Sequence, residues 1–349
     1  MNAENEIEFC GRLLGPDQPA FIVAEIGFNH NGDVRLARQM IESAARNGAD
    51  AVKLQTFIGG ELISRTVRGP DPDQPDREIS LYEFFERYQL SRKDYAALFD
   101  YARKLKVPLF STPFDEASLD MLVDLGMPAI KVASPDLTHL PLLVRAAKTD
   151  LPIVLSTGMA TNEEIETALK TIRDAGNERI ILLHCVSNYP ARHSEMNLLC
   201  LGQMRSRFGV PVGLSDHTSD NLSAIVAASL GAVMIEKHFT TDRNLSGADQ
   251  KISMEPGELA ELKEAILNVR TILGDGVKRV QASEEPARRS ARRSLVARVD
   301  IEPGTVLTSD MLAVKRPGTG IPPADMEKVV GRKTKTKIPA EQVITWEMI

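Results

Sequence analysis

The chain has 349 residues, of which 43% are hydrophobic and 26% charged, values typical of a globular protein in water. Its formal net charge of -6 argues against a nucleic-acid binder. No apolar run approaches the roughly 20 residues that span a bilayer, and the acidic start "MNAENEIEFCGR" is not a secretory signal, so we expect no membrane association. Because Cys10, Cys185 and Cys200 form no C-x-x-C pair, we expect a cytoplasmic protein.

Apolar segments of strand length recur along the first two-thirds of the chain, and helical patterns separate most of them. The segments are Phe21–Ile26, Ala51–Phe57, Val107–Thr112, Ala129–Ser134, Pro152–Thr157, Arg179–Cys185, Val210–His217 and Ala232–His238. Eight such βα units predict an α/β fold, a (β/α)₈ TIM barrel. A doubly wound open sheet is the weaker alternative, because such sheets usually have fewer strands.

The segments between these strands give further local signals. Asp33 is a plausible N-cap of a helix that stops near Asn47–Gly48, and two more helical patterns cover Leu81–Tyr88 and Arg92–Leu105. The stretch Gly59–Ser80 contains "RGPDPDQPD", which is too rich in Pro and Asp for regular structure. It is either a specificity loop or a mobile surface excursion.

The pattern changes near residue 275. Residues 276–293 are charged and non-periodic, which is typical of a linker. Residues 294–349 contain the strand-like pieces "SLVARVDI" and "QVITWEM" and predict a small β-rich domain. We therefore expect a barrel over residues 1–275 and a separate domain over residues 294–349.

Polar side chains gather in the last half of the predicted strands. Because side chains alternate along a strand, Lys53 and Gln55 share a face, as do Ser215 and His217. The other late polar residues are Glu25, Thr112, Lys131, Ser134, Ser156, His184, Glu236 and His238. In a TIM barrel these ends converge on the face that carries active sites.

The two strand lysines, Lys53 and Lys131, are costly to bury without anionic partners. Carboxylates such as Glu25 and Glu236 are one choice of partner. With the neighbouring hydroxyls, the lysines also make a cradle for phosphate and carboxylate groups, and we favour the cradle.

His217 and His238 end the last two predicted strands, so their imidazoles can reach one point. Such a pair, with nearby carboxylates, can hold a divalent cation and leave positions open for substrate. A hydrogen-bonded structural role is the alternative, and His30 and His184 are the other candidate ligands.

Eight motifs, quoted in chain order, resemble the bacterial sialic acid synthase family: "AEIGFNHNGD", "AVKLQTF", "FSTPFD", "IKVAS", "LSTGMA", "GLSDHT", "EKHFT" and "VKRPGTG". The resemblance covers nearly the whole chain. It implies condensation of phosphoenolpyruvate with an N-acylated mannosamine-type sugar, giving a nine-carbon 2-keto sugar acid. It further implies Mn²⁺ or another divalent cation, an antifreeze-like (SAF) second domain and a domain-swapped homodimer.

The resemblance also implies residue roles. His217 and His238 match metal ligands, and Glu25, Lys53 and Lys131 match catalytic positions. The matching substrate positions are Gln55, Thr112, Ser134, Ser156, Tyr189, Ser215, Asp249 and Arg316, with Arg316 donated across the dimer. Because "CVSNYPAR" is spaced differently from some members, either Ser187 or Asn188 takes the phosphate-side role.

Several alternatives stay open. The sugar is N-acetylmannosamine or a diacetamido-trideoxy sugar of the legionaminic type, with a pseudaminic acid synthase as the alternative. A metal-dependent aldolase or another phosphoenolpyruvate-condensing barrel shares the metal site and the cradle, but does not predict the second domain. An ice- or glycan-binding protein and a degenerate scaffold are weaker, since no polar strand end is missing.

Overall fold

The computed structural model describes residues 6–71 and 76–349. The chain divides into two compact units, Met1–Gly274 and Asp275–Ile349, and each is described by itself. In the described residues no helix is long and apolar enough to cross a membrane.

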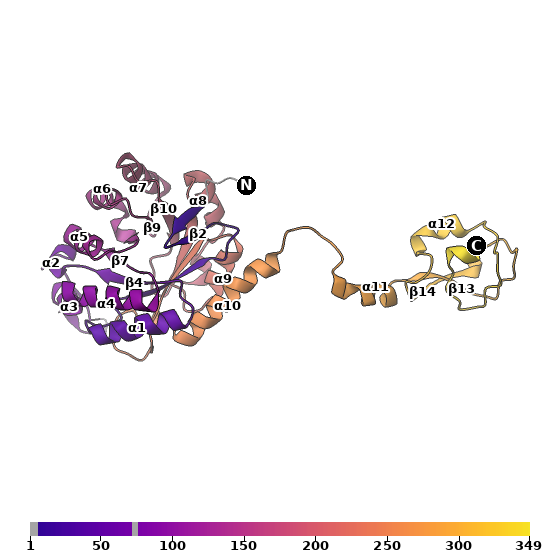
Figure 1. Cartoon of the computed structure of the whole chain (residues 1–349), viewed down its shortest axis with the longest axis horizontal. Coiled ribbons are helices and arrows are strands. Elements are labelled where there is room, and N and C mark those ends of the chain that lie inside the picture. The colour runs from indigo at the N-terminus through magenta and orange to yellow at the C-terminus, as the bar shows by residue number, and fades with distance from the viewer. Residues whose placement is uncertain (1–5, 72–75) are drawn as a thin grey trace. The chain divides into compact units, whose positions relative to one another are not determined.

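The first unit is built on a closed barrel of eight parallel strands, in the order β10-β11-β12-β3-β4-β7-β8-β9 (Figure 1). The strands are β3 (Phe21–Gly27), β4 (Ala51–Thr56), β7 (Leu109–Pro113), β8 (Ile130–Val132), β9 (Ile153–Ser156), β10 (Ile180–Cys185), β11 (Val212–Asp216) and β12 (Met234–His238). Each of the eight predicted segments overlaps one of them, and only β3 and β7 extend beyond their segments, by one residue each. The predicted barrel is therefore confirmed, and the open sheet is excluded.

Helices surround the strands on the outside (Figure 1). They are α1 (Val34–Arg46), α4 (Arg92–Leu105), α5 (Glu116–Asp124), α6 (Leu140–Ala147), α7 (Asn162–Asp174), α8 (Cys200–Phe208), α9 (Leu222–Ser229) and α10 (Pro256–Leu273). Helix α1 shows how the sequence determines where such a helix begins and which face it buries. The Asp33 carboxylate caps α1 by accepting the Arg35 N–H, as predicted, and Ala37, Met40, Ile41 and Ala44 form its buried face.

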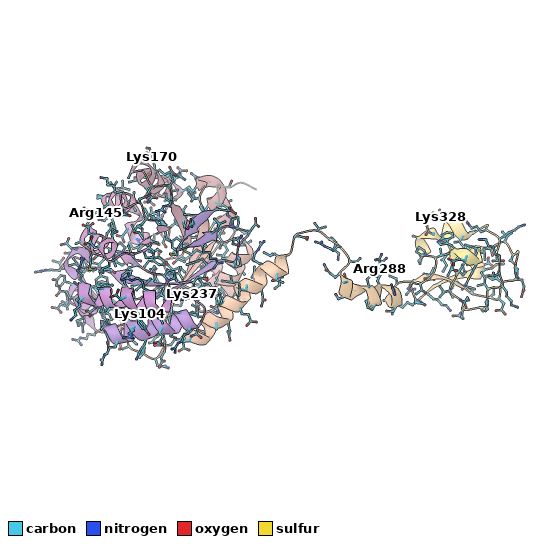
Figure 2. All side chains as sticks on the ribbon, viewed as in Figure 1. Lys104, Arg145, Lys170, Lys237, Arg288 and Lys328 are labelled. Carbon is cyan, nitrogen blue, oxygen red and sulfur yellow. The ribbon has the colours of Figure 1, made fainter. Side chains whose placement is uncertain are left out.

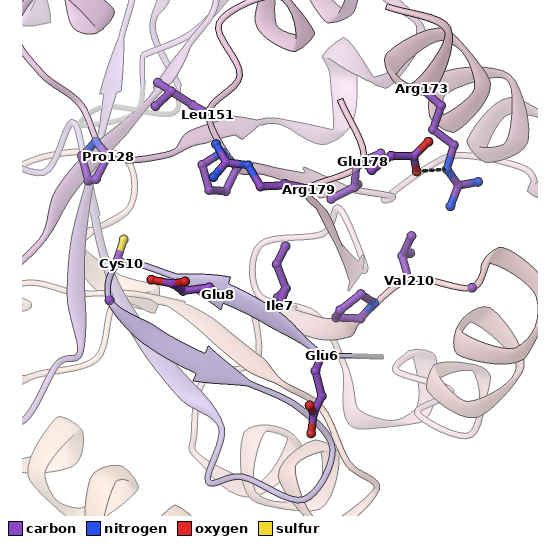
Figure 3. Close-up of a pocket in the computed structure, with 15 residues that line it drawn as sticks. Glu6, Ile7, Glu8, Cys10, Pro128, Leu151, Arg173, Glu178, Arg179 and Val210 are labelled. Carbon is purple, nitrogen blue, oxygen red and sulfur yellow. Dashed lines mark hydrogen bonds and ion pairs between the residues drawn. The ribbon is translucent and has the colours of Figure 1, made fainter. Parts of the chain in front are cut away.

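A hairpin that the sequence did not predict, β1 (Ile7–Phe9) with β2 (Arg12–Leu14), closes the amino-terminal end of the barrel. Phe9 is fully buried and packs edge-on against Phe21 and Phe110, near the starts of β3 and β7. A cavity of about 660 Å³ lies between this hairpin and the starts of neighbouring strands (Figure 3). None of the predicted site residues lines it.

The excursion after β4 is more regular than its sequence suggests. It holds the short helix α2 (Gly59–Leu62), an antiparallel pair of β5 (Arg68–Pro70) with β6 (Glu78–Ser80), and α3 (Leu81–Tyr88). The prediction of irregular structure was wrong for α2, β5 and β6, whereas α3 confirms the predicted helix Leu81–Tyr88. Residues 72–75 of that loop lie outside the described residues.

The second unit contains the helix α11 (Glu285–Ala291), in the stretch where the sequence predicted a non-periodic connector. Its sheet pairs β13 (Ser294–Ala297) with β14 (Leu312–Lys315), and α12 (Met326–Val329) follows. The predicted strand in "QVITWEM" was wrong: Val343 makes one bridge to Val296, and residues 346–348 form a 3-10 turn. A small separate core holds these pieces, with members such as Leu295, Ile301, Leu312 and Ile344.

Candidate active site

A cavity of about 140 Å³ opens at the carboxyl ends of the barrel strands, where each strand contributes a polar side chain. Its lining comprises Glu25, Lys53, Gln55, Thr112, Phe114, Lys131, Ala133, Ser134, Pro135, Ser156, Cys185, Tyr189, Ser215, His217, Glu236 and His238. Eleven of the residues singled out from the sequence as site residues are among them. Of the rest, Ser187, Asn188 and Asp249 lie outside this lining, and Arg316 belongs to the second unit.

The two lysines form the charged floor of the cavity, which we call the lysine floor, and both are almost fully buried. The Lys53 ammonium lies 2.6 Å from Glu25 Oε2 and donates to Thr112 Oγ1 at 2.9 Å. Lys131 donates to Ser156 Oγ at 2.6 Å and to the carbonyl of Val132 at 2.8 Å. Since an ammonium has three donors, each lysine keeps one for a ligand.

Glu236 lies between the two lysines, with its carboxylate oxygens 3.8 Å from Lys53 Nζ and 3.9 Å from Lys131 Nζ. It also accepts a hydrogen bond from Ser215 Oγ at 3.0 Å. The sequence placed Glu236 on the correct face and offered it as one possible partner of the lysines, and the two ion pairs confirm that pairing. Its partnership with both lysines depends on the closure of the barrel, which places β12 two strands from β4 and opposite β8.

The buried carboxyl groups of Glu25 and Glu236 have different pKa values. Burial raises the pKa of Glu25 to about 7, against the opposing effect of Lys53. Burial also raises the pKa of Glu236, but Lys131 and Lys53 outweigh it and hold that pKa below its usual value. Glu236 is therefore ionised at neutral pH, while Glu25 can both take up and release a proton there.

The two predicted histidine ligands lie side by side, with ring centroids 5.5 Å apart. His217 Nδ1 donates to the carbonyl of Val186 at 2.9 Å, which leaves its Nε2 free to bind a cation. His238 Nδ1 is buried without a hydrogen bond and lies 3.7 Å from Asp249 Oδ2. Burial lowers the pKa of His238 despite Asp249, so its imidazole is neutral, the form that binds metals.

The other two candidate ligands from the sequence, His30 and His184, do not line the cavity. His184 bonds the Met196 carbonyl at 2.7 Å, and His30 Nδ1 accepts the N–H of Gly32 at 3.1 Å. In strand β10 it is Cys185, the neighbour of His184, that faces the site, with its sulfur 3.8 Å from His217 Nδ1. The prediction that His184 belongs to the polar mouth was wrong by one residue, since adjacent strand side chains point to opposite faces.

The structure separates Ser187 from Asn188. A Cβ atom on Gly158 would lie 2.3 Å from Ser187 Oγ and 2.8 Å from Ser134 Oγ, so both serine hydroxyls converge on this glycine. The Asn188 amide instead points to Glu195 at 3.4 Å. Only glycine at position 158 leaves room for the two hydroxyls.

Asp136 is a nearby group that sequence reasoning missed. It lies in the 3-10 turn Ser134–Thr138 that directly follows β8, and its Oδ2 is buried without a hydrogen-bond partner. Burial raises the pKa of Asp136 to about 6. The available signal was its position, two residues after the serine that ends the predicted strand.

A metal site built from protein ligands alone is absent from residues 6–71 and 76–349, where no three His, Cys, Asp or Glu side chains are grouped to hold an ion. His217, with its Nε2 free, and the neutral imidazole of His238, 5.5 Å away between ring centroids, fit a cation whose remaining positions belong to water and substrate. The donors present therefore fit an open site.

Residues 40–278 match the NeuB family, and residues 292–349 match the SAF domain. The chain belongs to the NeuB family. The N,N'-diacetyllegionaminic acid synthase of Legionella pneumophila is 37% identical over 96% of this chain and 96% of its own length. The human N-acetylneuraminate-9-phosphate synthase is 32% identical over 99% of this chain and 97% of its own.

A solved structure is similar to this NeuB-family chain over most of its length. The N-acetylneuraminic acid (sialic acid) synthetase from Leptospira borgpetersenii, in complex with citrate, has a TM-score of 0.73 and 36% identity. The match covers 81% of this chain and 95% of that one. The resemblance inferred from the motifs is thereby confirmed, and so is the barrel followed by a SAF domain.

Proposed function

We propose that this protein condenses phosphoenolpyruvate with an N-acylated mannosamine-type sugar, forming a sialic acid-like 2-keto sugar acid and phosphate. One observation carries the proposal: two buried lysines, each with a spare donor, lie beside a carboxyl group of pKa about 7 and a histidine pair. Membership of the NeuB family, whose named relatives are synthases of such acids, supports it.

Phosphoenolpyruvate carries the negative charge that the lysine floor fits. Lys53 and Lys131 would each donate their remaining N–H to its phosphate or carboxylate oxygens, because charge-assisted hydrogen bonds are the stronger ones. The hydroxyl groups around them complete the cradle, from Thr112, Ser134, Ser156, Ser187 and Ser215. Glu236 supplies a negative charge beside both lysines until the substrate replaces it as their partner.

A divalent cation, Mn²⁺ or Mg²⁺, would be held by His217 and His238. When bound, it supplies Lewis-acid polarisation of the sugar aldehyde. Asp249, 3.7 Å from His238 Nδ1, orients that ring.

The chain's own groups then account for the remaining steps. Carbon 3 of phosphoenolpyruvate bonds to the aldehyde carbon, whose oxygen becomes a hydroxyl, and carbon 2 becomes electron-poor. Water adds at carbon 2, and one of its protons passes through Glu25 to the former aldehyde oxygen, while the two lysines stabilise the anionic groups. The C–O bond to phosphate then breaks as the new hydroxyl on carbon 2 gives its proton to the leaving phosphate, which leaves the 2-keto acid and inorganic phosphate.

The proposal includes a homodimer in which Arg316 of one subunit serves the barrel of its partner. The support is the resemblance of "VKRPGTG" to the family motif and the match of residues 292–349 to the SAF domain. An arginine suits this task because its planar guanidinium binds carboxylates and hydroxyl groups at fixed angles.

Phosphate release from phosphoenolpyruvate tests the proposal. The full-length protein is incubated with Mn²⁺ and, in turn, N-acetylmannosamine, its 6-phosphate and the 2,4-diacetamido-trideoxy sugars of the manno and altro series. We expect release that requires both a sugar and the cation, and stops when a chelator is added. Lys131→Met, with a neutral side chain on the floor, should lower kcat/KM for phosphoenolpyruvate by roughly 100-fold or more.

Release without any sugar, or full activity in chelator, would contradict the proposed condensation or the proposed metal site respectively. Silence with every sugar would leave the metal-dependent aldolase as the better function for this barrel.

A further inference from the structure

The segment between β12 and α10 brings Asp249 to the edge of the active site. It contains the 3-10 turn Gln250–Ile252, which directly follows Asp249. Asp249 lines a second cavity of about 340 Å³, which shares Gln55, Tyr189 and His238 with the active-site cavity. Its Oδ2 lies 3.7 Å from His238 Nδ1, beyond the length of a hydrogen bond, so that ring does not hold the carboxylate in place.

A buried chain of hydrogen bonds holds the segment. The Asn29 side-chain amide donates to Ser253 Oγ at 2.8 Å and to the carbonyl of Phe239 at 3.0 Å. Ser253 Oγ in turn donates to the carbonyl of Asp249 at 2.6 Å. This chain of donors fixes the backbone from which the Asp249 side chain projects.

Gln250 ties down the same segment at a second point. Its Nε2 donates to the Asn29 carbonyl at 2.7 Å, and its Oε1 accepts from the Thr240 hydroxyl at 2.5 Å. We call Asn29, Thr240, Gln250 and Ser253 the loop clamp, and each of them is at most 1% exposed. Because buried hydrogen bonds are strong and costly to leave unmade, this network favours a single conformation of the segment.

The loop clamp joins the ends of two neighbouring barrel strands. Asn29 lies two residues after β3, the strand that carries Glu25, whereas the other three members follow β12, which ends at His238. The two strands pair in parallel, with Glu25 opposite His238. The clamp therefore connects the backbone beside Glu25 to the segment that carries Asp249.

We infer that the loop clamp positions the Asp249 carboxylate against His238 and the sugar, and that Asn29, Gln250 and Ser253 are positioning residues of the reaction. This inference rests on the proposed condensation and its cation site. The described lining of the two cavities includes none of the three, so they act through Asp249 rather than by touching a substrate. The lysine floor belongs to β4 and β8, which carry no member of the clamp.

The Mn²⁺ affinity of the full-length protein, measured by calorimetry, gives the first test. Ser253→Ala removes only the hydroxyl that links Asn29 to Asp249, and we expect about 10-fold weaker Mn²⁺ binding. For the sugar that is turned over best, KM should rise about 10-fold, while KM for phosphoenolpyruvate stays unchanged. Ser111→Ala is the matched control and should change none of these values. Ser111 is equally buried, bonds the Thr56 hydroxyl and is absent from the described lining of both cavities.

A double-mutant cycle distinguishes positioning from a general loss of stability. If the clamp acts through Asp249, adding Ser253→Ala to Asp249→Ala should change the Mn²⁺ affinity by less than about twofold. Thr240→Val, which keeps the side-chain shape and removes the other hydroxyl of the clamp, should also weaken Mn²⁺ binding. It takes the place of Ser253→Ala if circular dichroism shows that Ser253→Ala does not fold.

An Mn²⁺ affinity that falls no further in Ser253→Ala than in Ser111→Ala would overturn the inference. So would an undiminished effect of Ser253→Ala in the Asp249→Ala protein. Asp249→Ala with unchanged Mn²⁺ affinity and unchanged KM for the sugar would overturn it as well, and would leave the condensation intact. If no sugar releases phosphate, the proposed condensation fails, but the Mn²⁺ affinities still decide whether the clamp positions Asp249.

Discussion

Glu25 is the residue whose protonation the barrel controls most directly. Its Oε1 accepts the Gln55 amide at 3.1 Å, and its Oε2 lies beside Lys53. Burial opposes ionisation while Lys53 favours it, and the outcome is a pKa of about 7. A carboxyl group poised there can accept the proton of an attacking water at neutral pH.

The Glu25 pKa predicts a pH profile. The group accepts a proton only when ionised, so kcat/KM should rise with pH, reach half its maximum near pH 7, and fall about tenfold per unit below it. Glu25→Gln should lower kcat by roughly 10²- to 10⁴-fold and remove this ascending limb. Steady-state kinetics from pH 5.5 to 8.5 measure both effects.

The control is cation binding to Glu25→Gln, measured by calorimetry. It should be unchanged, because Glu25 is not among the proposed ligands. Near-normal kcat in Glu25→Gln, with cation binding intact, would rule out its role in proton transfer.

At the residue scale the sequence predicts which side chains meet, but not how they share charge. Lys53, Lys131 and the serines follow from strand parity, because a residue's face is fixed by its place in a strand. The sequence predicted His184 in the site, whereas its neighbour Cys185 lines the cavity. A shift of one position along a strand moves the side chain to the opposite face of the sheet. The pKa of Glu25 depends on a dielectric environment that only the closed barrel creates.

At the scale of elements, β11 and β12 carry a buried ion pair on the side opposite to the cavity. Lys237 Nζ lies 3.0 Å from Asp216 Oδ2 and donates to the Thr218 carbonyl at 2.6 Å. Asp216 Oδ1 also accepts from the backbone N–H and the hydroxyl of Thr218. Since these residues flank His217 and His238, the pair fixes the backbone that carries both imidazoles.

Removal of one partner predicts a large loss of stability. Lys237→Met leaves the Asp216 charge buried without its cation, which typically costs about 3–5 kcal/mol in the free energy of unfolding. The double variant Asp216→Asn/Lys237→Met should cost less than Lys237→Met alone, because no charge is then stranded. Unfolding in urea should be monitored by circular dichroism. Tryptophan fluorescence does not report on the barrel, since the single tryptophan, Trp346, lies in the second unit.

Lys170→Met is the matched control. Lys170 is an exposed lysine paired with Asp174, 74% of its side chain is accessible, and such surface pairs contribute little (Figure 2). If Lys237→Met were no more destabilising than Lys170→Met, the buried pair would not support the two strands.

Elements with a strong periodic pattern are the ones that the sequence predicts well. Helices α3 and α4 begin and end where their patterns do, helped by the capping box of Ser91 and Asp94. The hairpins β1–β2 and β5–β6 were missed because strands of three residues have too few positions to show alternation. Their pairing is decided by what they contact in the folded chain.

For the whole molecule, the proposed dimer makes a testable prediction about Arg316, which lies in the second unit. A protein with Lys131→Met and a second with Arg316→Ala should each be nearly inactive. If Arg316 acts in the partner's barrel, mixed dimers contain one complete site. Random subunit exchange should then restore roughly a quarter of the wild-type activity.

Subunit exchange needs its own control, which is light scattering of the mixture and of each protein alone. Two copies of Lys131→Met mixed after separate labelling should exchange equally well and stay inactive. Persistent inactivity of the Lys131→Met and Arg316→Ala mixture, with exchange demonstrated, would place Arg316 in its own subunit's barrel or outside catalysis.

The hairpin β1–β2 closes the amino-terminal end of the barrel, so that the barrel is open at its carboxyl-terminal end. Phe9 is packed into the base of the barrel, and His217 and His238 line the cavity above the lysine floor at the opposite end. In a site with one entrance, the ligand that binds deepest must bind first and leave last. The three-carbon donor must arrive before the sugar that covers it, and whatever lies on the floor leaves only after the larger product has gone.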